Sequence, residues 1–393
     1  MHILLIALII LLCTPIILIF LKIIWAFYMC FGCSSFKRGK ADILKRRRYL
    51  INQTKKTPQQ LLDRMPKEIG SQFQGEWAIY TYSMLSTALT NIAEIYPETR
   101  EESVKVIDSL IQKVMSPEIR KYDMHRWGED PLETLDGDKS HLSYISILAW
   151  MISQYKFLEG DGKYDNLFHT LCATMNRRMF QHNSLSLQTY PGEVIYLPDM
   201  LVAIVALSNY SKLYNGKYSQ TVELWINKAK SEFVDSNTGL LCSYIYENNE
   251  TIEKKSDIRG SFSALNCYYL TFINKEFAKE QYKKFKKIFL QTFLISGFKE
   301  YRIKTQNFTF DIDAGPILFN FSPSGTAFGI GSVTYHKDFR LRKKLLYTAE
   351  LAGSSVSFKG EKHYLLANIA LVGEAIVLAM KTAKEWKVPN TLK

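Results

Sequence analysis

The amino-acid sequence predicts an all-α fold, an α/α toroid of about six helical hairpins preceded by one N-terminal transmembrane helix. Apolar residues recur at helical spacing through most of the chain, and strongly apolar helices alternate with more polar ones. A first segment without charges precedes this pattern. With 47% hydrophobic and 22% charged residues, the 393-residue chain is not a disordered protein, and six cysteines are too few for a disulfide scaffold.

The N-terminal segment is predicted to be an uncleaved membrane anchor, residues 1–36. Residues 3–21 carry no charge, and this length of helix spans about 28 Å at ~1.5 Å per residue. Lys22 and an aromatic cluster at residues 23–28 follow, as at a membrane interface. No basic region precedes the apolar run and no convincing A-x-A cleavage site follows it, which argues against a signal peptide.

Residues 37–56 are predicted to form a basic juxtamembrane collar. They hold nine Lys and Arg residues against one acid, Asp42, whereas residues 57–393 carry only +3 of the net charge of +12. A nearly neutral body does not favour nucleic-acid binding. We expect the collar to lie against anionic lipid headgroups or to be a plain stop-transfer flank. The positive-inside rule predicts a single-pass membrane protein with its body in the cytoplasm.

Residues 57–393 are predicted to form one toroid domain of paired helices. The first pair comprises residues 77–95 and 100–115. The other expected pairs are 141–158 with 164–180, 199–213 with 218–233, 261–273 with 277–293, and 315–333 with 339–351, followed by a long apolar helix at 363–384. Residues 57–65 are a candidate for a twelfth helix, and short β segments are expected near 240–246 and 297–303.

The alternation of helix types favours a closed ring. Helices that are apolar all round must be buried on both sides, whereas outer helices need one polar face. Two of the hairpins also share a Gly-Lys-Tyr turn, with Tyr164 and Tyr218 54 residues apart. A closed ring buries the inner helices on both sides and one face of each outer helix in a single core. We therefore prefer a ring to two or three small domains.

In such a ring, the loops that lead into the inner helices converge at one end. Polar residues there are the candidates for a site. The catalytic candidates are Glu76, His141, Asp199, Asp311 and Asp313, and the substrate-binding candidates are Trp77, Arg126, Trp127, Asp130, Tyr190, Glu193, Tyr196 and Arg259. Carboxyl groups in different environments divide acid and base roles, and aromatic rings stack on a sugar face or an isoprenoid chain.

Each catalytic candidate also has a structural interpretation. Asp199 is equally suited to capping a helix, His141 to packing in the core, and Glu76 to interacting with a helix dipole. Arg259 after Asp257 fits a simple ion pair. Two carboxylates two residues apart in an extended segment point the same way, so Asp311 and Asp313 favour a site.

No motif demands a metal or a cofactor. The chain has no H-E-x-x-H, no paired C-x-x-C and no G-x-S-x-G motif, which argues against zincins, zinc ribbons and α/β-hydrolases. The glycine-rich stretch at residues 321–332 lacks the Gly-Lys-Ser/Thr ending of a phosphate loop. Close helix packing through small residues is the simpler interpretation of that stretch.

Several short motifs resemble the linalool dehydratase/isomerase family. They are Arg126-Trp-Gly-Glu-Asp-Pro131, His141-Leu-Ser-Tyr, the Gly-Lys-Tyr164 turn, Tyr190-Pro-Gly-Glu193 and Phe233-Val-Asp-Ser-Asn-Thr-Gly239. The resemblance covers residues 70–380 and implies an α/α-barrel, with His141 matching the family's histidine. The family also uses two cysteines around the loop at residues 187–199, where this sequence has none.

Three functions are compatible with these features. The first is a membrane-anchored enzyme that acts on a glycan or glycolipid by carboxylate and histidine acid–base chemistry, as a hydrolase, lyase or epimerase. The second, implied by the resemblance, is a hydro-lyase or isomerase of an isoprenoid or lipid alcohol. The third is a non-catalytic binding scaffold, which scattered carboxylates would favour.

Overall fold

The computed structural model describes residues 2–32, 36–158, 160–248, 251–254, 258–292, 295–303 and 306–388, with the side chains of residues 2–10, 30–32 and 36–38 excepted. These parts of the chain contain fifteen α-helices, several 3-10 turns and four small antiparallel sheets.

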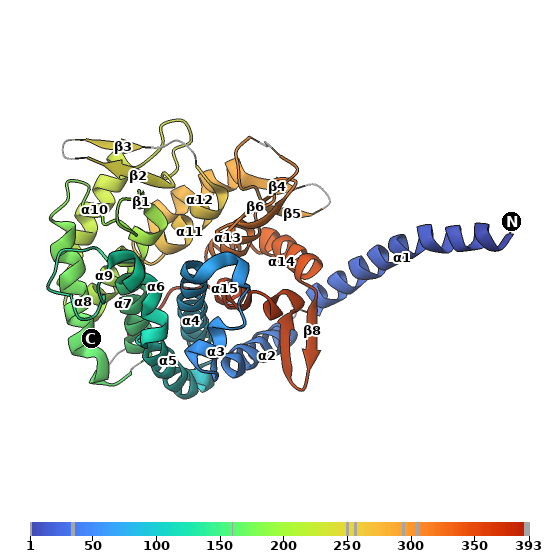
Figure 1. Cartoon of the computed structure of the whole chain (residues 1–393), viewed down its shortest axis with the longest axis horizontal. Coiled ribbons are helices and arrows are strands. Elements are labelled where there is room, and N and C mark those ends of the chain that lie inside the picture. Colours follow the sequence, from blue (N-terminus) through green and yellow to red (C-terminus); the bar gives the residue numbers. More distant parts are fainter. Residues whose placement is uncertain are drawn as a thin grey trace.

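A closed ring of inner helices forms the centre of the body (Figure 1). Each inner helix packs against the next, and the last packs against the first. In order around the ring they are α4 (Gly70–Ile95), α7 (Leu142–Phe157), α9 (Leu197–Leu213), α11 (Gly260–Leu270), α13 (Pro323–Tyr335) and α15 (Leu371–Lys381). Nearly every residue of α7 and α11 is buried, as expected for helices covered on all sides. The predicted α/α toroid is therefore confirmed.

The outer helices are amphipathic and cover the ring. They are α5 (Arg100–Val114), α8 (Asp165–Met179), α10 (Ser219–Glu232), α12 (Lys275–Phe289) and α14 (Phe339–Gly353). A sixth outer helix is α2 (Phe36–Thr54), which packs against α15 and α4. The segment predicted as a juxtamembrane collar is thus part of the toroid, and α3 (Pro58–Leu62) is too short to be the twelfth helix.

Buried ion pairs fix α2 to the end of the chain. Arg46 is fully buried, 2.7 Å from Glu374 and 3.1 Å from Glu350, with Asp42 at 3.3 Å on the same helix. Lys362 pairs with Asp42 from the other side at 2.6 Å.

Other cationic side chains of this segment also form ion pairs with the body. Arg47 is buried and pairs with Glu102 at 2.7 Å, and Lys40 pairs with Glu98. Residues 37–56 are therefore not uniformly a lipid-facing collar or a plain flank, because these cations pair with acidic side chains of the body. The exposed cations of α2 are Lys45 and Arg48, with Lys55 just after the helix, while the side chains of residues 37 and 38 lie outside the described part.

The C-terminal segment differs from the long helix predicted at residues 363–384. It forms a hairpin of β8 (Ser355–Phe358) and β9 (Glu361–Tyr364), then η4 (Leu365–Asn368) and α15. Lys359 and Gly360 have φ of 47° and 80°, which is the conformation of a two-residue hairpin turn. The residues between 355 and 364 therefore pair as strands, although the sequence after them is apolar enough for a helix.

The remaining elements connect the hairpins. They are α6 (Pro117–Trp127), η1 (Lys67–Ile69), η2 (Pro97–Thr99), η3 (Gly162–Tyr164), β1 (Ile195–Tyr196), β2 (Tyr244–Glu247), β3 (Ile252–Lys254), β4 (Leu290–Thr292), β5 (Ser296–Phe298), β6 (Phe308–Asp311) and β7 (Gly315–Leu318). Strand β1 runs directly into α9, β2 and β3 precede α11, and β6 and β7 precede α13. These sheets therefore lie at the N-terminal ends of inner helices, an end of the ring that we call the mouth.

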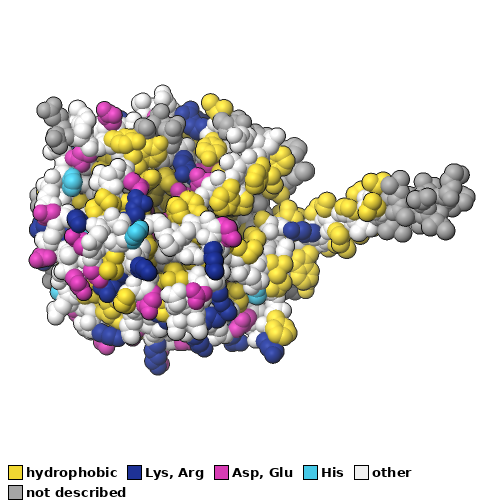
Figure 2. All heavy atoms as spheres, viewed as in Figure 1, with side chains coloured by type: hydrophobic (Ala, Val, Ile, Leu, Met, Phe, Trp, Pro, Cys, Tyr) yellow, Lys and Arg dark blue, Asp and Glu magenta, His cyan; other side chains and the backbone are white. Residues whose placement is uncertain are grey.

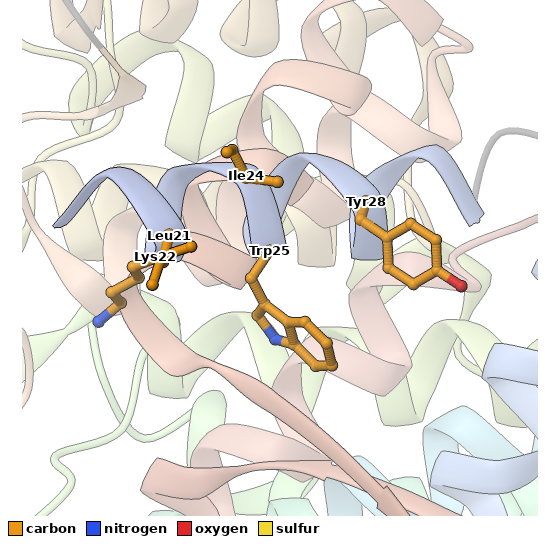
Figure 3. A pocket seen from close by; sticks show the side chains of 5 residues that line it. All are labelled: Leu21, Lys22, Ile24, Trp25 and Tyr28. Atoms are coloured by element: carbon orange, nitrogen blue, oxygen red, sulfur yellow. The ribbon is translucent and has the colours of Figure 1, made fainter. Parts of the chain in front are cut away.

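A single helix, α1 (His2–Gly32), projects from the body (Figures 1 and 2). Its segment Leu11–Met29 is apolar and long enough to cross a membrane, and only 6% of it is buried. Helix α1 meets the body at α14, and Ala26 is fully buried. Trp25 and Tyr28 project from one side of α1 near this junction, where they border a shallow open depression (Figure 3).

Candidate active site

Asp199 lies in the first turn of α9, at the mouth. Its carboxylate accepts a hydrogen bond from the Thr189 hydroxyl at 2.8 Å, and the Tyr80 hydroxyl is 3.5 Å away. The N-cap position of α9 is occupied by Tyr196, and Asp199 lies inside the first turn, so Asp199 is not the N-cap residue. Burial raises the pKa of Asp199 to about 6, and the charge of Asp313 contributes. This carboxyl group can gain or lose a proton near neutral pH.

Glu76 faces the same region from the second turn of α4. Its Oε1 accepts hydrogen bonds from the Tyr190 hydroxyl at 2.5 Å and from the Gln72 amide at 2.7 Å. Burial raises the pKa of Glu76 to about 7, with the charges of Asp199 and Asp313 adding to it. The pKa values of Glu76 and Asp199 are thus both near neutrality and similar to each other.

The turn between β6 and β7 carries the third carboxyl group. Asp313 lies 3.6 Å from the guanidinium group of Arg259, and 46% of its side chain is accessible. Burial among the surrounding loops still raises its pKa, against the opposing charge of Arg259. Its charge also acts on Glu76 and Asp199, and Asp313 is exposed whereas those two groups are partly buried.

Arg259, which precedes α11, holds this turn in place. It donates to the buried Glu300 at 2.6 Å and to Asp311 at 2.7 Å. Burial opposes the charge of Asp311, but Arg259 and the backbone N–H groups of Asp313 and Ala314 outweigh it and lower its pKa. Asp311 is therefore stabilised in its ionised form and positions the turn, and the two aspartates have different environments.

Aromatic side chains line the mouth between these carboxyl groups. Tyr196 on β1 packs edge-on against Tyr244 and Phe262, with ring centroids 6.1 and 6.0 Å apart. The Arg259 guanidinium group lies 4.6 Å from the centre of the Phe262 ring. Trp77, next to Glu76 on α4, is half-buried. Faces and edges of this kind bind the apolar surfaces of sugars or lipids.

Arg126 closes another side of the mouth. Its guanidinium group lies 4.4 Å from the centre of the Tyr190 ring and pairs with Glu193. Both charged side chains remain about one-third accessible, at 32% and 34%. They are therefore available to polar groups of a ligand, and Arg126 contacts the tyrosine that binds Glu76.

His141 is not accessible. Its ring has no exposed surface, its Nδ1 lies 2.5 Å from Asp123 and its Nε2 lies 3.4 Å from Glu129. Trp127 packs beside it at 5.3 Å between ring centroids. The Ser143 hydroxyl donates to the other oxygen of Asp123 at 3.2 Å. A substrate cannot reach His141 in this arrangement, so the histidine supports the loop between α6 and α7 and does not line the site.

Asp130 also has a structural role. It pairs with Arg120 at 2.6 Å and accepts the backbone N–H of Leu132 at 2.9 Å. Asp257 lies outside the described residues. The structure thus brings together Glu76, Trp77, Arg126, Tyr190, Glu193, Tyr196, Asp199, Arg259, Asp311 and Asp313, while His141, Trp127 and Asp130 support the neighbouring loop.

Several residues of the site were not predicted from the sequence. Tyr80 and Thr189 contact Asp199, Glu300 anchors Arg259, and Phe262 contacts Tyr196. Only Tyr80 had a local signal, since it lies four residues after Glu76 and so on the same helix face. The others depend on contacts between distant segments.

The described cysteines of the body do not favour the thiolate form. Cys172, Cys242 and Cys267 are buried, and burial raises the pKa of Cys242 to about 11 and those of the other two further. Within the described residues, no group of three or more His, Cys, Asp or Glu side chains is arranged to hold a metal ion.

Comparisons with known proteins identify the fold. No family model and no curated protein matches the chain. A family 105 glycoside hydrolase from C. acetobutylicum superposes with a TM-score of 0.51 at 13% identity, over 76% of this chain and 92% of that one. A family 76 glycoside hydrolase from a bovine Bacteroides thetaiotaomicron strain (TM-score 0.48, 11% identity, 79% and 69% coverage) and a polysaccharide lyase (0.45, 12%, 78% and 89%) are more distant. At these identities the likeness concerns the α/α toroid alone.

Proposed function

We propose that this chain is a membrane-anchored enzyme that acts on the carbohydrate of a glycan or glycolipid by carboxyl acid–base chemistry. The observation that carries the proposal is the grouping of Glu76, Asp199 and Asp313 at the mouth, with pKa values of about 7 and 6 for the two inner groups. Carboxyl groups whose protonation differs near neutral pH are suited to paired acid and base roles.

Glu76 is assigned as the general acid. Both of its hydrogen bonds reach Oε1, so Oε2 is the oxygen that carries the proton. Burial raises the pKa of Glu76 to about 7 and that of Asp199 to about 6, so Glu76 is the group assigned to hold its proton to higher pH. Glu76 then donates its proton to a leaving oxygen, and Asp199 accepts one from water or from the sugar. Asp313, which is exposed, is placed to contact the incoming water.

The lining of the mouth supports a carbohydrate ligand. The half-buried Tyr196 and Trp77 offer aromatic surface, and Arg126 and Glu193 offer a charged donor and acceptor for hydroxyl groups. The solved structure with a TM-score of 0.51 is a glycoside hydrolase, which makes a carbohydrate substrate the first to test.

An isoprenoid or lipid alcohol is the second candidate substrate, as the resemblance to the linalool dehydratase/isomerase family implies. The exposed apolar helix α1 favours it, because an anchor holds the protein where such substrates dissolve. The buried cysteines make cysteine-assisted dehydration unsuitable, so this route also relies on Glu76 and Asp199. A non-catalytic scaffold accounts for the toroid but gives no reason for the protonation behaviour of these carboxyl groups.

The membrane assignment rests on α1. We place the body on the cytoplasmic side, because Lys22 and the cations of α2 all follow the apolar segment. Protease digestion of intact and opened cells tests this orientation, since a cytoplasmic body is protected until the membrane is opened.

The function is tested with the full chain in lipid nanodiscs and a panel of oligosaccharides, glycolipids, geraniol and linalool. Products are detected by mass spectrometry for the natural sequence, for Asp199→Asn and for Asp138→Asn. Asp138 is a matched control, because its side chain is 77% accessible and pairs only at the surface. Loss of product with Asp199→Asn alone supports the site, and the substrate that is converted identifies the class.

A further inference from the structure

The hairpin of β6 and β7 has an apolar face that nothing in the described structure covers. In its register Phe308 pairs with Leu318 and Phe310 with Pro316, so these four side chains share one face. All four are exposed, with Phe308 at 61%, Phe310 at 60% and Leu318 at 52%. The opposite face carries Ile317, which is buried. A two-stranded hairpin in water normally shows a polar outer face.

The apolar face lies on the side of the body from which α1 projects. Strand β7 contacts α13, α13 contacts α14, and α14 contacts α1, while β5 joins the hairpin region to α14. Figure 1 shows β5 and β6 beside α14 on this side, and Figure 2 shows hydrophobic side chains gathered there.

More exposed apolar side chains lie in the segment that follows α14, the helix that α1 contacts. Phe358 at the tip of the β8–β9 hairpin is 72% exposed, and Leu365, Leu366 and Ile369 around η4 are 49%, 54% and 60% exposed. Lys359 follows Phe358 in the turn, so a cation flanks the apolar tip. Apolar tips next to cations are typical of segments that enter a lipid interface.

The aromatic residues of α1 set the depth of the membrane surface relative to the body. Trp25 and Tyr28 are the residues that settle at the headgroup level, and their ring centroids are 6.2 Å apart. Ala26, between them, is fully buried, and α1 contacts α14. The body therefore begins where the hydrocarbon core ends, with no spacer between them.

We propose that the apolar face of the β6–β7 hairpin inserts into the bilayer interface beside α1, with the β8–β9 tip and η4 as a second contact. The lipid bilayer is the occupant, because α1 already brings this side of the body to a membrane and further exposed apolar residues follow α14, the helix that α1 contacts.

This arrangement deepens, and rests on, the proposed function. The turn of the same hairpin carries Asp311 and Asp313, so the mouth opens next to the lipid surface. The favoured substrate is then amphiphilic: a saccharide head group that enters the mouth while its lipid tail stays in the bilayer.

Insertion is measured on the full chain in phosphatidylcholine–phosphatidylglycerol vesicles. An environment-sensitive fluorophore is attached at Phe310→Cys, in a background with Cys13, Cys30 and Cys33 replaced by serine. The matched control is Leu224→Cys on α10, an apolar residue with 41% exposure on the opposite side of the body. Quenching by nitroxide-labelled lipids and by aqueous iodide is compared, and thermal unfolding verifies that both variants fold.

The proposal predicts that nitroxide-labelled lipids quench the fluorophore at least threefold more strongly at position 310 than at position 224. Aqueous iodide is expected to quench it more strongly at position 224 than at position 310. Equal and strong iodide quenching at both positions overturns it. Protection of position 310 from both quenchers, together with cross-linking between copies, also overturns it and identifies a second copy as the occupant. Because the measurement needs no substrate, it stands or fails separately from the proposed enzymatic function.

Discussion

The hydroxyl group of Tyr190 donates a 2.5 Å hydrogen bond to Oε1 of Glu76, which links the loop before α9 to α4. The two residues are 114 positions apart in the chain. The contact joins the loop before α9 to α4 at the mouth, and it affects the carboxyl group that we assign as the general acid. A hydrogen bond of this kind favours the ionised carboxylate and so limits the rise in its pKa.

Replacing this tyrosine shifts the pH dependence of the reaction. Tyr190→Phe removes the donor, the pKa of Glu76 rises further, and the alkaline limb of the kcat/KM profile moves to higher pH. Tyr164→Phe is the control, because it removes a hydroxyl bound to Asp108 between outer helices. Superimposable profiles for Tyr190→Phe and the natural sequence contradict the assignment of Glu76.

Glu76 also gives the stability of the protein a pH dependence. A carboxyl group with a pKa of about 7 in place of the ordinary 4.5 costs on the order of 3 kcal/mol when it ionises in the folded state. The folded state binds the proton more tightly, so the natural protein loses this stability as pH rises from 4.5 to 7. Glu76→Gln removes that loss, and urea unfolding at pH 5 and pH 8 measures it. The difference in unfolding free energy between Glu76→Gln and the natural protein is therefore expected to be larger at pH 8 than at pH 5. An equal difference at both pH values contradicts the raised pKa.

The ion pairs of α2 are expected to be important for folding. Arg46→Met leaves Glu350 and Glu374 buried without their cation, which costs about 3–5 kcal/mol. Lys105→Ala is the control, since its pair with Glu101 is fully exposed and contributes little to stability. Denaturant unfolding in detergent compares the two, and equal stabilities would show that α2 is not fixed in this way.

His141 is expected to affect stability more than chemistry. His141→Gln disturbs the buried Asp123 and lowers the unfolding free energy by about 1–3 kcal/mol, because a buried carboxyl group loses its partner. The pH profile of the remaining folded enzyme stays that of the natural sequence. A selective fall in kcat at unchanged melting temperature would instead assign His141 to the reaction.

The toroid was predictable because its signal is local and repeated. Helices such as α7 and α9 are apolar all round, and this pattern requires burial on every side. The role of α2 was not predictable, because Arg46 finds Glu374 328 residues away and a cation-rich helix looks like a solvated flank. The β8–β9 hairpin was missed because its turn at Lys359 and Gly360 is followed by an apolar run.

The sequence predicted which residues lie at the site better than it predicted what each of them does there. Glu76 and Asp199 were found because they precede or begin apolar inner helices. The sequence does not distinguish them from His141, since the burial of that ring depends on Asp123 and Trp127 in α6. Asp311 and Asp313 also look alike in the sequence, and only the position of Arg259 separates them.

The central claim is that the mouth is a carboxyl acid–base site, and the activity of Asp199→Asn tests it most directly. With the substrate found in the nanodisc panel, we predict that Asp199→Asn lowers kcat by about 10²–10⁴ while retaining its melting temperature, and that Asp138→Asn remains fully active. Activity of Asp199→Asn equal to that of the control would contradict the claim.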